Sequence, residues 1–263
     1  MRQLTFLIFF VLSAAMTGHA DEGKWQEHKT THFYIYYKTA PLDFVENVAQ
    51  AAEGYYAEIT RNLGFTRYEN WSYEKRASIY IYRDQDDYVI SAKTAGWSHG
   101  VANAKDKVIR TFPSAHGFFD STLPHEMGHI IFREFVGFRS ALPLWLDEGV
   151  AMYQEKAKRW GANDSVFQAI KTKTFIPLPE LSVMSLTSET DSKVVNLFYA
   201  EAASIVYYLI SELGQYRFVA FCQKLKDGET FEKALTDTYP RFTDLEGLNR
   251  TWTKYLEEQS TKE

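Results

Sequence analysis

Residues 123–130 read Leu-Pro-His-Glu-Met-Gly-His-Ile, and this short stretch decides the fold and carries the chemistry of the chain. On a helix, residues four apart lie on the same face about one turn apart. The imidazoles of His125 and His129 can therefore reach one metal ion. Neutral imidazole is a common ligand of zinc, which favours four-coordinate sites. The spacing predicts a zinc site on a helix.

Two carboxylates complete the predicted site. Glu148 follows His129 by 19 positions, within the sequence Trp-Leu-Asp-Glu-Gly-Val-Ala at 145–151. Catalytic zinc sites use three protein ligands and leave the fourth position to water, so Glu148 is the predicted third ligand. Glu126 follows His125 by one residue and projects beside the metal rather than onto it. There it can take a proton from the water that the metal activates.

The flanking residues favour a buried helix for the motif. Ser121 is predicted to cap the start of the helix, Pro124 is tolerated only in its first turn, and Gly137 can end it. The stretch 130–136 continues the helix with mostly apolar residues. Histidine and glutamate on such a helix would be costly to bury without partners. A metal is the partner that this composition suggests.

Two plainer interpretations stay open from these residues alone. The motif could lie on a surface helix with its histidines and glutamate facing water. Asp147 and Glu148 could simply begin a helix and interact favourably with its dipole. The apolar approach at 144–146 argues against the second interpretation. Gly149 and Ala151 would also permit another helix to come close.

With these motifs in place, the chain resembles the gluzincin metallopeptidases, and most nearly the peptidase MA-like domains related to the M1 aminopeptidase catalytic domain. Three stretches carry the resemblance, at 123–130, at 144–153 (Leu-Trp-Leu-Asp-Glu-Gly-Val-Ala-Met-Tyr) and at 198–209 (Phe-Tyr-Ala-Glu-Ala-Ala-Ser-Ile-Val-Tyr-Tyr-Leu). The M1 family has the same spacing between its first histidine and its third ligand as His125 and Glu148 have here.

The resemblance implies an α+β fold of the thermolysin-like zincin type. A mixed strand and helix lobe is expected at 25–120 and a helical lobe at 121–263, with the active-site cleft between them. Together they would form one catalytic domain at 21–263, with one Zn²⁺ per chain and a peptide or protein as substrate. The third stretch resembles an M1 segment that begins with a tyrosine and continues into a helix. In the M1 family that tyrosine helps to stabilise the tetrahedral intermediate, and the match places this role on Tyr199.

One feature of the aminopeptidases is missing. Their Gly-Ala-Met-Glu-Asn motif anchors the amino terminus of the substrate, and this sequence does not contain it. Exopeptidase activity is therefore not implied, and an endopeptidase or a specialised peptidase fits equally well.

Periodicity and turn residues predict the order of the elements. Strands are expected at 33–37 and 77–82, and the segments 101–104 and 108–112 are expected to pair as a hairpin around Lys105-Asp106. Helices are expected at 41–63 (ended by Gly64), 84–93, 200–213, 216–225, 231–239 and 244–258. The first part of the chain is thus mixed, and the part after residue 121 is almost entirely helical.

Residues 1–20 resemble a secretory signal, because Arg2 precedes a mostly apolar run that ends in Gly18-His19-Ala20. The run is shorter than the roughly 20 residues that span a bilayer, although an uncleaved anchor stays open. The chain is therefore expected to be extracytoplasmic, either periplasmic or secreted, and bacterial, with no membrane span after cleavage. The sequence contains one cysteine, Cys222, so it offers no intrachain disulfide.

Charge argues against nucleic acid as a partner. The full chain has a formal net charge of −5, and cleavage after residue 20 would remove one basic and no acidic residue. Nucleic-acid binding relies on clustered Lys and Arg.

Several further residues carry open alternatives. The segment 108–112 is either a sheet edge that receives the substrate backbone or an ordinary edge strand, and 182–193 is either a mobile flap or a plain surface loop. His99 and His116 could bind substrate or a tetrahedral oxyanion, or be ordinary histidines. Asp147 could orient a ligand histidine. Tyr207 and Tyr208 are expected in the core or at its rim. Cys222 is expected to be a small core residue rather than a reactive thiol.

Three functions fit the sequence. The first is an exported zinc metallopeptidase with His125, His129 and Glu148 as ligands, Glu126 as general base and Tyr199 at the oxyanion. The second is a non-catalytic module that keeps the fold and a structural metal, against which the intact Glu126 argues. The third is a zinc hydrolase of a non-peptide amide, such as a cell-wall bond. The oligomeric state and the scissile bond stay open.

Overall fold

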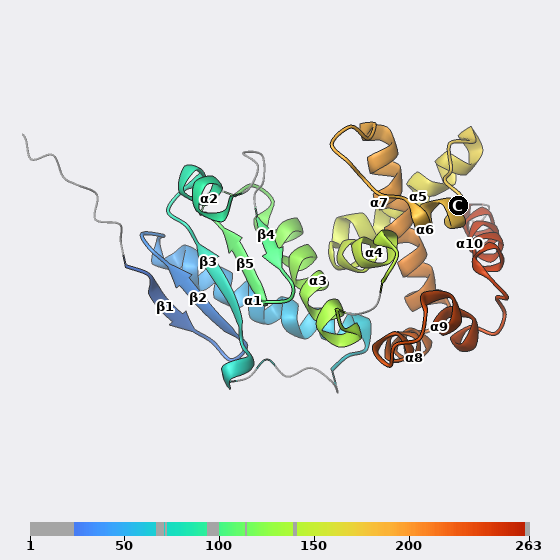
Figure 1. Ribbon diagram of the computed structural model, residues 1–263. Coiled ribbons are helices and arrows are strands. Elements are labelled where there is room, and N and C mark those ends of the chain that lie inside the picture. The colour runs from blue at the N-terminus through green and yellow to red at the C-terminus, as the bar shows by residue number, and fades with distance from the viewer. Residues whose placement is uncertain are drawn as a thin grey trace, which may run out of the picture.

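The computed structural model of the chain combines a five-stranded sheet with a larger helical part (Figure 1). It describes residues 24–66, 71, 73–93, 100–113, 115–138 and 141–260. The strands are β1 (Gln26–Lys29), β2 (Phe33–Tyr37), β3 (Ala77–Ile81), β4 (Val101–Asn103) and β5 (Val108–Thr111). The predicted α+β class is confirmed. The predicted signal segment 1–20 lies outside the described residues.

The helices of the first part are α1 (Leu42–Leu63), α2 (Gln85–Ala92) and α3 (Leu123–Val136). The later helices are α4 (Leu144–Gln154), α5 (Lys156–Thr172), α6 (Leu178–Val183), α7 (Ser192–Tyr207), α8 (Gln215–Lys226), α9 (Phe231–Thr238) and α10 (Leu245–Ser260). Short turns of other helical types lie at Tyr73–Lys75, Phe118–Thr122 and Tyr208–Glu212. Most predicted elements are confirmed to within a few residues. The α-helix that holds Tyr199 begins eight residues earlier than predicted and ends at Tyr207, with a π-helical turn covering Tyr208–Glu212.

The sheet has the strand order β1-β2-β3-β5-β4, with β2, β3 and β5 parallel and the two outer strands antiparallel to their neighbours. Ile35, Ile79 and Ile109 lie side by side in this register and are fully buried. They share a hydrophobic core with residues of α1 and α3, which cover that face. The short helix α2 packs on the opposite face through Tyr88. Alternating burial along the central strands therefore positions α3 against the sheet.

The position of β5 corrects one prediction. The segment 108–112 was expected to be a sheet edge, but β5 lies between β3 and β4, so it is internal. The predicted turn at Lys105-Asp106 does form, and it folds β4 back onto β5 as the true edge strand. The opposite edge, β1, was not predicted because its sequence Gln-Glu-His-Lys carries no apolar alternation.

The start of α3 corrects a second prediction. Ser121 was expected to be the helix cap, yet it lies in a π-helical turn at Phe118–Thr122 that runs directly into α3. Its backbone N–H bonds to the carbonyl of Gly117, so it does not have the extended conformation of a capping residue. The predicted end is confirmed, because Gly137 follows α3 with a φ of 87°.

The segment 182–193 is not a single loop. The helix α6 ends at Val183 and α7 begins at Ser192, with the Asp191 side chain accepting a hydrogen bond from the N–H of Lys193. The connection between the two helices is therefore shorter than the predicted flap or loop.

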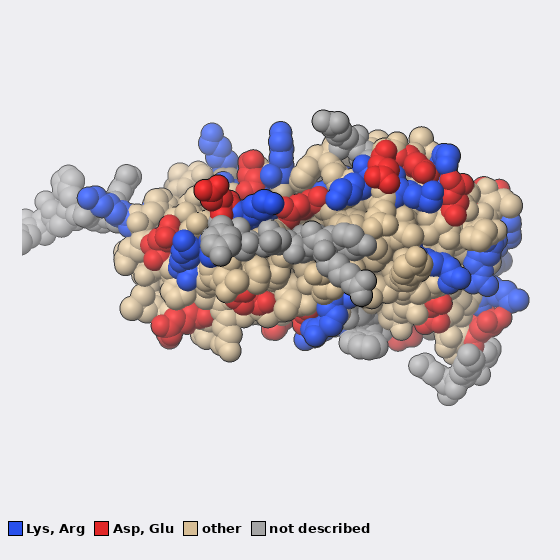
Figure 2. Space-filling model, turned by 90° about the horizontal axis from the view of Figure 1, so that it is seen from below, with Lys and Arg blue, Asp and Glu red and all other residues tan. Residues whose placement is uncertain are grey.

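Helix α7 runs through the middle of the helical part and packs against α4 and α5 (Figure 1). Within the described residues, Ser192–Glu212 is the one segment long and apolar enough to cross a membrane, with a mean hydropathy of 1.4. More than half of that window is buried inside the protein, as in the central helix of a folded core. Lys, Arg, Asp and Glu are interspersed over the face shown in Figure 2.

Gly149 allows α4 and α7 to come close. A Cβ at this position would lie 2.3 Å from the carbonyl oxygen of Ala202 and 2.7 Å from Cγ2 of Val206. The oxygen belongs to the backbone of α7, so it cannot turn aside as a side chain would. The close helix contact predicted at Gly149 is confirmed.

We expect Gly149→Ala to lower the free energy of unfolding by about 3 kcal/mol or more, because an extra methyl group in a closely packed core forces backbone shifts. Urea unfolding followed by circular dichroism would measure this. Gly54→Ala in α1 is the matched control, since a Cβ there meets nothing within 4 Å. The control should gain about 0.5–1 kcal/mol from the better helix propensity of alanine. Equal effects at the two positions would contradict the close contact.

Candidate metal centre

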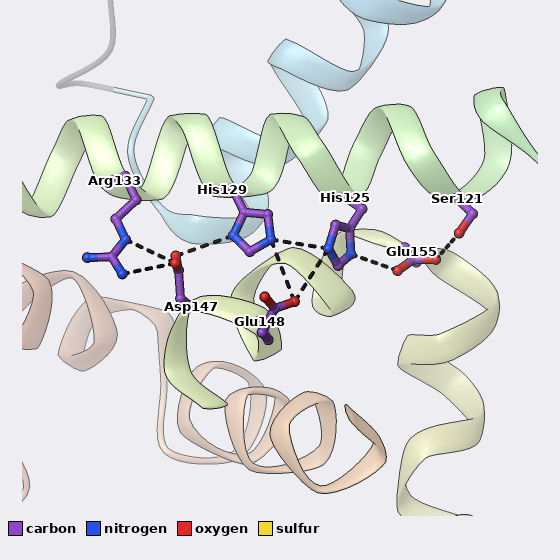
Figure 3. Close-up of polar contacts among 7 residues, drawn as sticks. All are labelled: Ser121, His125, His129, Arg133, Asp147, Glu148 and Glu155. Carbon is purple, nitrogen blue, oxygen red and sulfur yellow. Dashed lines mark hydrogen bonds and ion pairs between the residues drawn. The ribbon is translucent and has the colours of Figure 1, made fainter. Parts of the chain in front are cut away.

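One face of α3 and its leading turn carries a row of polar side chains (Figure 3). Ser121, His125, His129 and Arg133 are spaced four residues apart, so each lies about one turn from the next. The helix α4 crosses beneath this row and brings Glu148 and Asp147 up to it. The apolar residues on the other side of α3 are buried in the core, which fixes the direction of the row.

Three ligand atoms converge between the two helices. The Nε2 atoms of His125 and His129 are 3.1 Å apart, and Oε2 of Glu148 lies 3.6 Å from the first and 3.7 Å from the second. All three atoms fall within 4.8 Å of one another. Zinc at its usual bond lengths to nitrogen and oxygen would separate tetrahedral ligands by roughly 3.3 Å. The donor set therefore fits zinc in both chemistry and spacing, and it leaves a fourth position for water.

The other nitrogen of each histidine faces a carboxylate. Nδ1 of His125 lies 2.9 Å from Oε1 of Glu155, and Nδ1 of His129 lies 3.3 Å from Oδ1 of Asp147. A carboxylate partner favours a proton on Nδ1 and so leaves the lone pair of Nε2 free for a metal. The structure thus brings Asp147 to His129, as one of the alternatives from the sequence had it.

These carboxylates are themselves held in place. Arg133 donates from Nε and Nη2 to Oδ2 of Asp147, at 3.0 and 2.9 Å. The hydroxyl of Ser121 donates to Oε2 of Glu155, whose side chain is almost fully buried. Both ends of the row in Figure 3 therefore fix a histidine through a carboxylate.

Glu155 and Arg133 were not predicted from the sequence. Glu155 is seven positions after Glu148, a spacing that corresponds to two turns of an uninterrupted helix, although the residue itself lies just past the end of α4. That spacing was the available signal. Arg133 had a similar one, because it lies four residues after His129 on the same face of the predicted helix.

Glu126 lies beside the three ligands. Burial raises the pKa of its carboxyl above the ordinary value, and the neighbouring imidazoles of His125 and His129 oppose this only in part. The backbone N–H of Ala102, in the edge strand β4, donates a hydrogen bond to Glu126. The raised pKa makes this carboxylate a stronger proton acceptor than an exposed glutamate.

Tyr199 faces the same site from α7. It lines two hollows that also contain His125 and Glu126. Burial raises the pKa of its hydroxyl, and the negative charges of Glu148 and Glu126 raise it further. The hydroxyl therefore keeps its proton at neutral pH and can donate a hydrogen bond.

The sequence left a role in substrate binding open for His116 and His99. His116 is exposed in the turn before the π-helical segment. It is not one of the described residues that line either hollow. His99 lies outside the described residues. Cys222 is fully buried in the hydrophobic core, and burial raises the pKa of its thiol, so its predicted role as a core residue is confirmed.

The metal-free site binds protons strongly. Burial would lower the pKa of His129, but the contacts with Asp147 and Glu148 outweigh this and raise it to about 10. Burial would raise the pKa of Glu148, but the two histidines lower it to about 2. At neutral pH the metal-free centre therefore holds an imidazolium between carboxylates.

Zinc binding at pH 7 is expected to release at least one proton, because the metal must displace the proton of His129, whose pKa of about 10 lies above that pH. Zinc affinity should then rise about tenfold per pH unit for each proton released. Calorimetric titration in buffers of different ionisation enthalpy would measure the proton count. Asp147→Asn is the control, and it should release fewer protons. Binding without proton release would contradict this ionisation state.

Sequence similarity to known proteins extends over most of the chain. The family model described as the Peptidase MA superfamily matches residues 68–258, which is more than half of the chain. The chain is also similar to aminopeptidase N of Streptomyces lividans, with 26% identity over 219 residues. That similarity covers 75% of this chain and 25% of the relative, so the chain spans about a quarter of the length of that protein.

Proposed function

We propose, from the premise that the chain belongs to the Peptidase MA superfamily, that it is a zinc-dependent metallopeptidase. One observation carries the proposal. Three ligand atoms from α3 and α4 converge, and a carboxylate that is not part of this set, that of Glu126, lies beside them. A purely structural metal site has no need for a spare base.

In this proposal His125, His129 and Glu148 hold the ion, which supplies Lewis acidity for the scissile carbonyl and for the attacking water. Glu126 takes a proton from that water and later delivers it to the leaving amine. Its raised pKa supports the first transfer, because burial makes this carboxylate a stronger proton acceptor than an exposed glutamate.

Glu155 and Asp147 act as positioning residues. Glu155 is hydrogen-bonded to Nδ1 of His125, and Asp147 lies at ion-pair distance from Nδ1 of His129, so each carboxylate helps to aim one Nε2 atom at a common point. Ser121 and Arg133 hold those carboxylates from behind.

The edge strand β4 is the proposed receptor of the substrate backbone. It is an outer strand of the sheet, and Ala102 within it lines the hollow that contains Glu126. An extended peptide can add to such an edge through main-chain hydrogen bonds. The proposed edge for substrate binding is therefore β4 and not β5.

Tyr199 is the proposed donor to the developing oxyanion. Removing one such donor from other hydrolases costs about 10²–10³-fold in kcat. We therefore expect Tyr199→Phe to lower kcat by that factor while zinc affinity stays the same. Steady-state kinetics together with a zinc titration would measure both. A fall in zinc affinity of similar size would assign the tyrosine to the metal site instead.

The cellular location is also a proposal. Residues 1–20 carry the pattern of an export signal, so we propose that the enzyme acts outside the cytoplasm. Fractionation of cells that produce the full chain, compared with a chain that begins at residue 21, would test this.

The function itself is tested by cleavage profiling. The protein would be stripped of metal with a chelator, reloaded with zinc and incubated with a peptide library and, separately, with purified cell-wall material. Peptide cleavage that disappears on chelation and returns with zinc supports the proposal. Turnover of wall material alone would favour a non-peptide amide, and undiminished turnover without metal would exclude the zinc mechanism.

A further inference from the structure

We infer that the enzyme selects a large apolar side chain at one of the two residues that flank the scissile bond, and that small residues on α5 and α7 set this preference. The inference rests on the proposed function and adds a substrate class to it. It comes from the hollow on the His125 side of the metal centre, which encloses about 680 Å³ and opens to solvent.

The two sides of the centre differ in character. The hollow on the His129 side, of about 430 Å³, contains Arg133, Asp147 and Glu148. The hollow on the His125 side begins at Ser121 and Glu155, at the other end of the row in Figure 3. The two hollows share His125, Glu126 and Tyr199. An extended substrate that passes these residues would therefore place the side chain on one side of the scissile bond in one hollow and the side chain on the other side in the other.

The larger hollow has walls of small side chains. Gly161 and Ala162 come from α5, and Ala200 and Ala203 come from α7, which packs against α5. A Cβ added at Gly161 would meet nothing within 4 Å, so this position faces open space. A volume of about 680 Å³ lies within the range of roughly 300–1,000 Å³ that is typical of ligand pockets. It can therefore accept a whole large side chain.

The floor of this hollow is apolar. Met152, Ala162 and Ala203 form a buried cluster against which Tyr199 packs. The carboxylate of Glu155 also lines the hollow, but its side chain is almost fully buried and its oxygens accept from Ser121 and His125. Thr122, Ser165 and Asn196 add polar groups to the lining, and the apolar surface beside them can bury a large side chain of the substrate.

The experiment compares pairs of fluorogenic peptides that carry Phe or Ala at a single position, scanned over both sides of the cleaved bond. We expect wild-type protein to prefer Phe on one side by at least about tenfold in kcat/KM. Gly161→Leu and Ala200→Leu, which add bulk from α5 and from α7, should each reduce the Phe/Ala ratio by at least about tenfold. Gly54→Leu, on the exposed face of α1, should leave the ratio unchanged.

Thermal melts check that the variants fold, and Gly161→Ala tests a smaller increase in side-chain volume. Leucine and alanine both have better helix propensity than glycine, and Gly161→Ala should give an intermediate ratio. A wild-type enzyme without preference on either side would overturn the inference. So would a preference that survives in folded Gly161→Leu and Ala200→Leu variants.

A binding measurement separates this inference from the proposed function. Zinc-loaded Glu126→Gln protein would be titrated with the same Phe and Ala peptides, and Gly161→Leu would be added to it. Hydrolysis by wild type without any Phe preference overturns the substrate class alone. A Phe preference in binding, lost with Gly161→Leu, but without hydrolysis by wild type, overturns the peptidase function alone. Neither binding nor hydrolysis would overturn both.

Discussion

Glu126→Gln is expected to abolish nearly all hydrolysis while zinc binding is retained. Glutamine has the same shape and can still accept the hydrogen bond from the N–H of Ala102, so the local structure should persist. It cannot take a proton from the attacking water. General acid–base groups typically contribute about 10²–10⁴-fold to the rate, and we expect kcat to fall by this factor.

Two measurements are needed to interpret that loss. Kinetics on any cleaved peptide gives kcat, and elemental analysis of the same sample gives the zinc content. Glu189→Gln, in the exposed connection between α6 and α7, is the matched control and should behave as wild type. Retention of more than a tenth of the activity in Glu126→Gln would rule out this residue as the general base. A parallel loss of zinc would make it a ligand.

The second large effect concerns Glu201, a fully buried carboxyl on α7. Its Oε1 atom accepts a hydrogen bond from the N–H of Ile176 at 2.9 Å. Its Oε2 atom has no hydrogen-bond partner among the described residues. Burial raises the pKa of Glu201 from 4.5 to about 8, with the hydrogen bond from Ile176 opposing this only in part. The folded protein therefore keeps this group protonated at neutral pH.

This shift should make the protein less stable as pH rises. Below about pH 4.5 the group is protonated in both the folded and the unfolded chain, and it favours neither. Between about pH 4.5 and pH 8 the unfolded chain loses this proton while the folded chain retains it, so unfolding becomes easier by about 1.4 kcal/mol per unit. Above about pH 8 both states are ionised, and the accumulated loss stays constant.

We expect Glu201→Gln to remove this dependence, because an amide does not ionise. Between pH 5 and pH 8 the wild-type protein should lose up to about 4 kcal/mol relative to the variant. Urea unfolding at several pH values, with chelator present in all samples, would measure the difference. Glu189→Gln serves again as an exposed control. Parallel pH profiles for wild type and Glu201→Gln would contradict a buried, protonated carboxyl.

Much of the fold could be predicted from local patterns. The strands β2 and β3 have the alternating apolar residues of half-buried strands, and Gly64 and Gly137 end their helices as expected. The errors arose where local pattern is a poor guide. The edge strand β1 is polar throughout, and Ser121 looks like a cap although the chain is already helical there.

In the candidate site, too, some relations follow from local sequence and others only from the packing of helices. His125, Glu126 and His129 lie on one helix, so their relation follows from helical geometry. Glu155 and Arg133 each had a helical spacing that pointed to them, but their roles as partners of His125 and of Asp147 appear only when α4 lies against α3. Tyr199 was singled out by resemblance alone, and the packing of α7 brings it beside Glu126.

The sequence alone indicated the candidate metal ligands and base on α3, because the spacing of His125, Glu126 and His129 on one helix is fixed by the rise of the helix. It also indicated Glu148 as the third ligand through its distance along the chain. The tertiary structure decided everything that depends on contacts between distant segments. These are the convergence of Glu148 on the histidines, the carboxylates behind them and the hollow that α3, α4, α5 and α7 line together. Side-chain packing between helices sets those distances, and no local pattern encodes it.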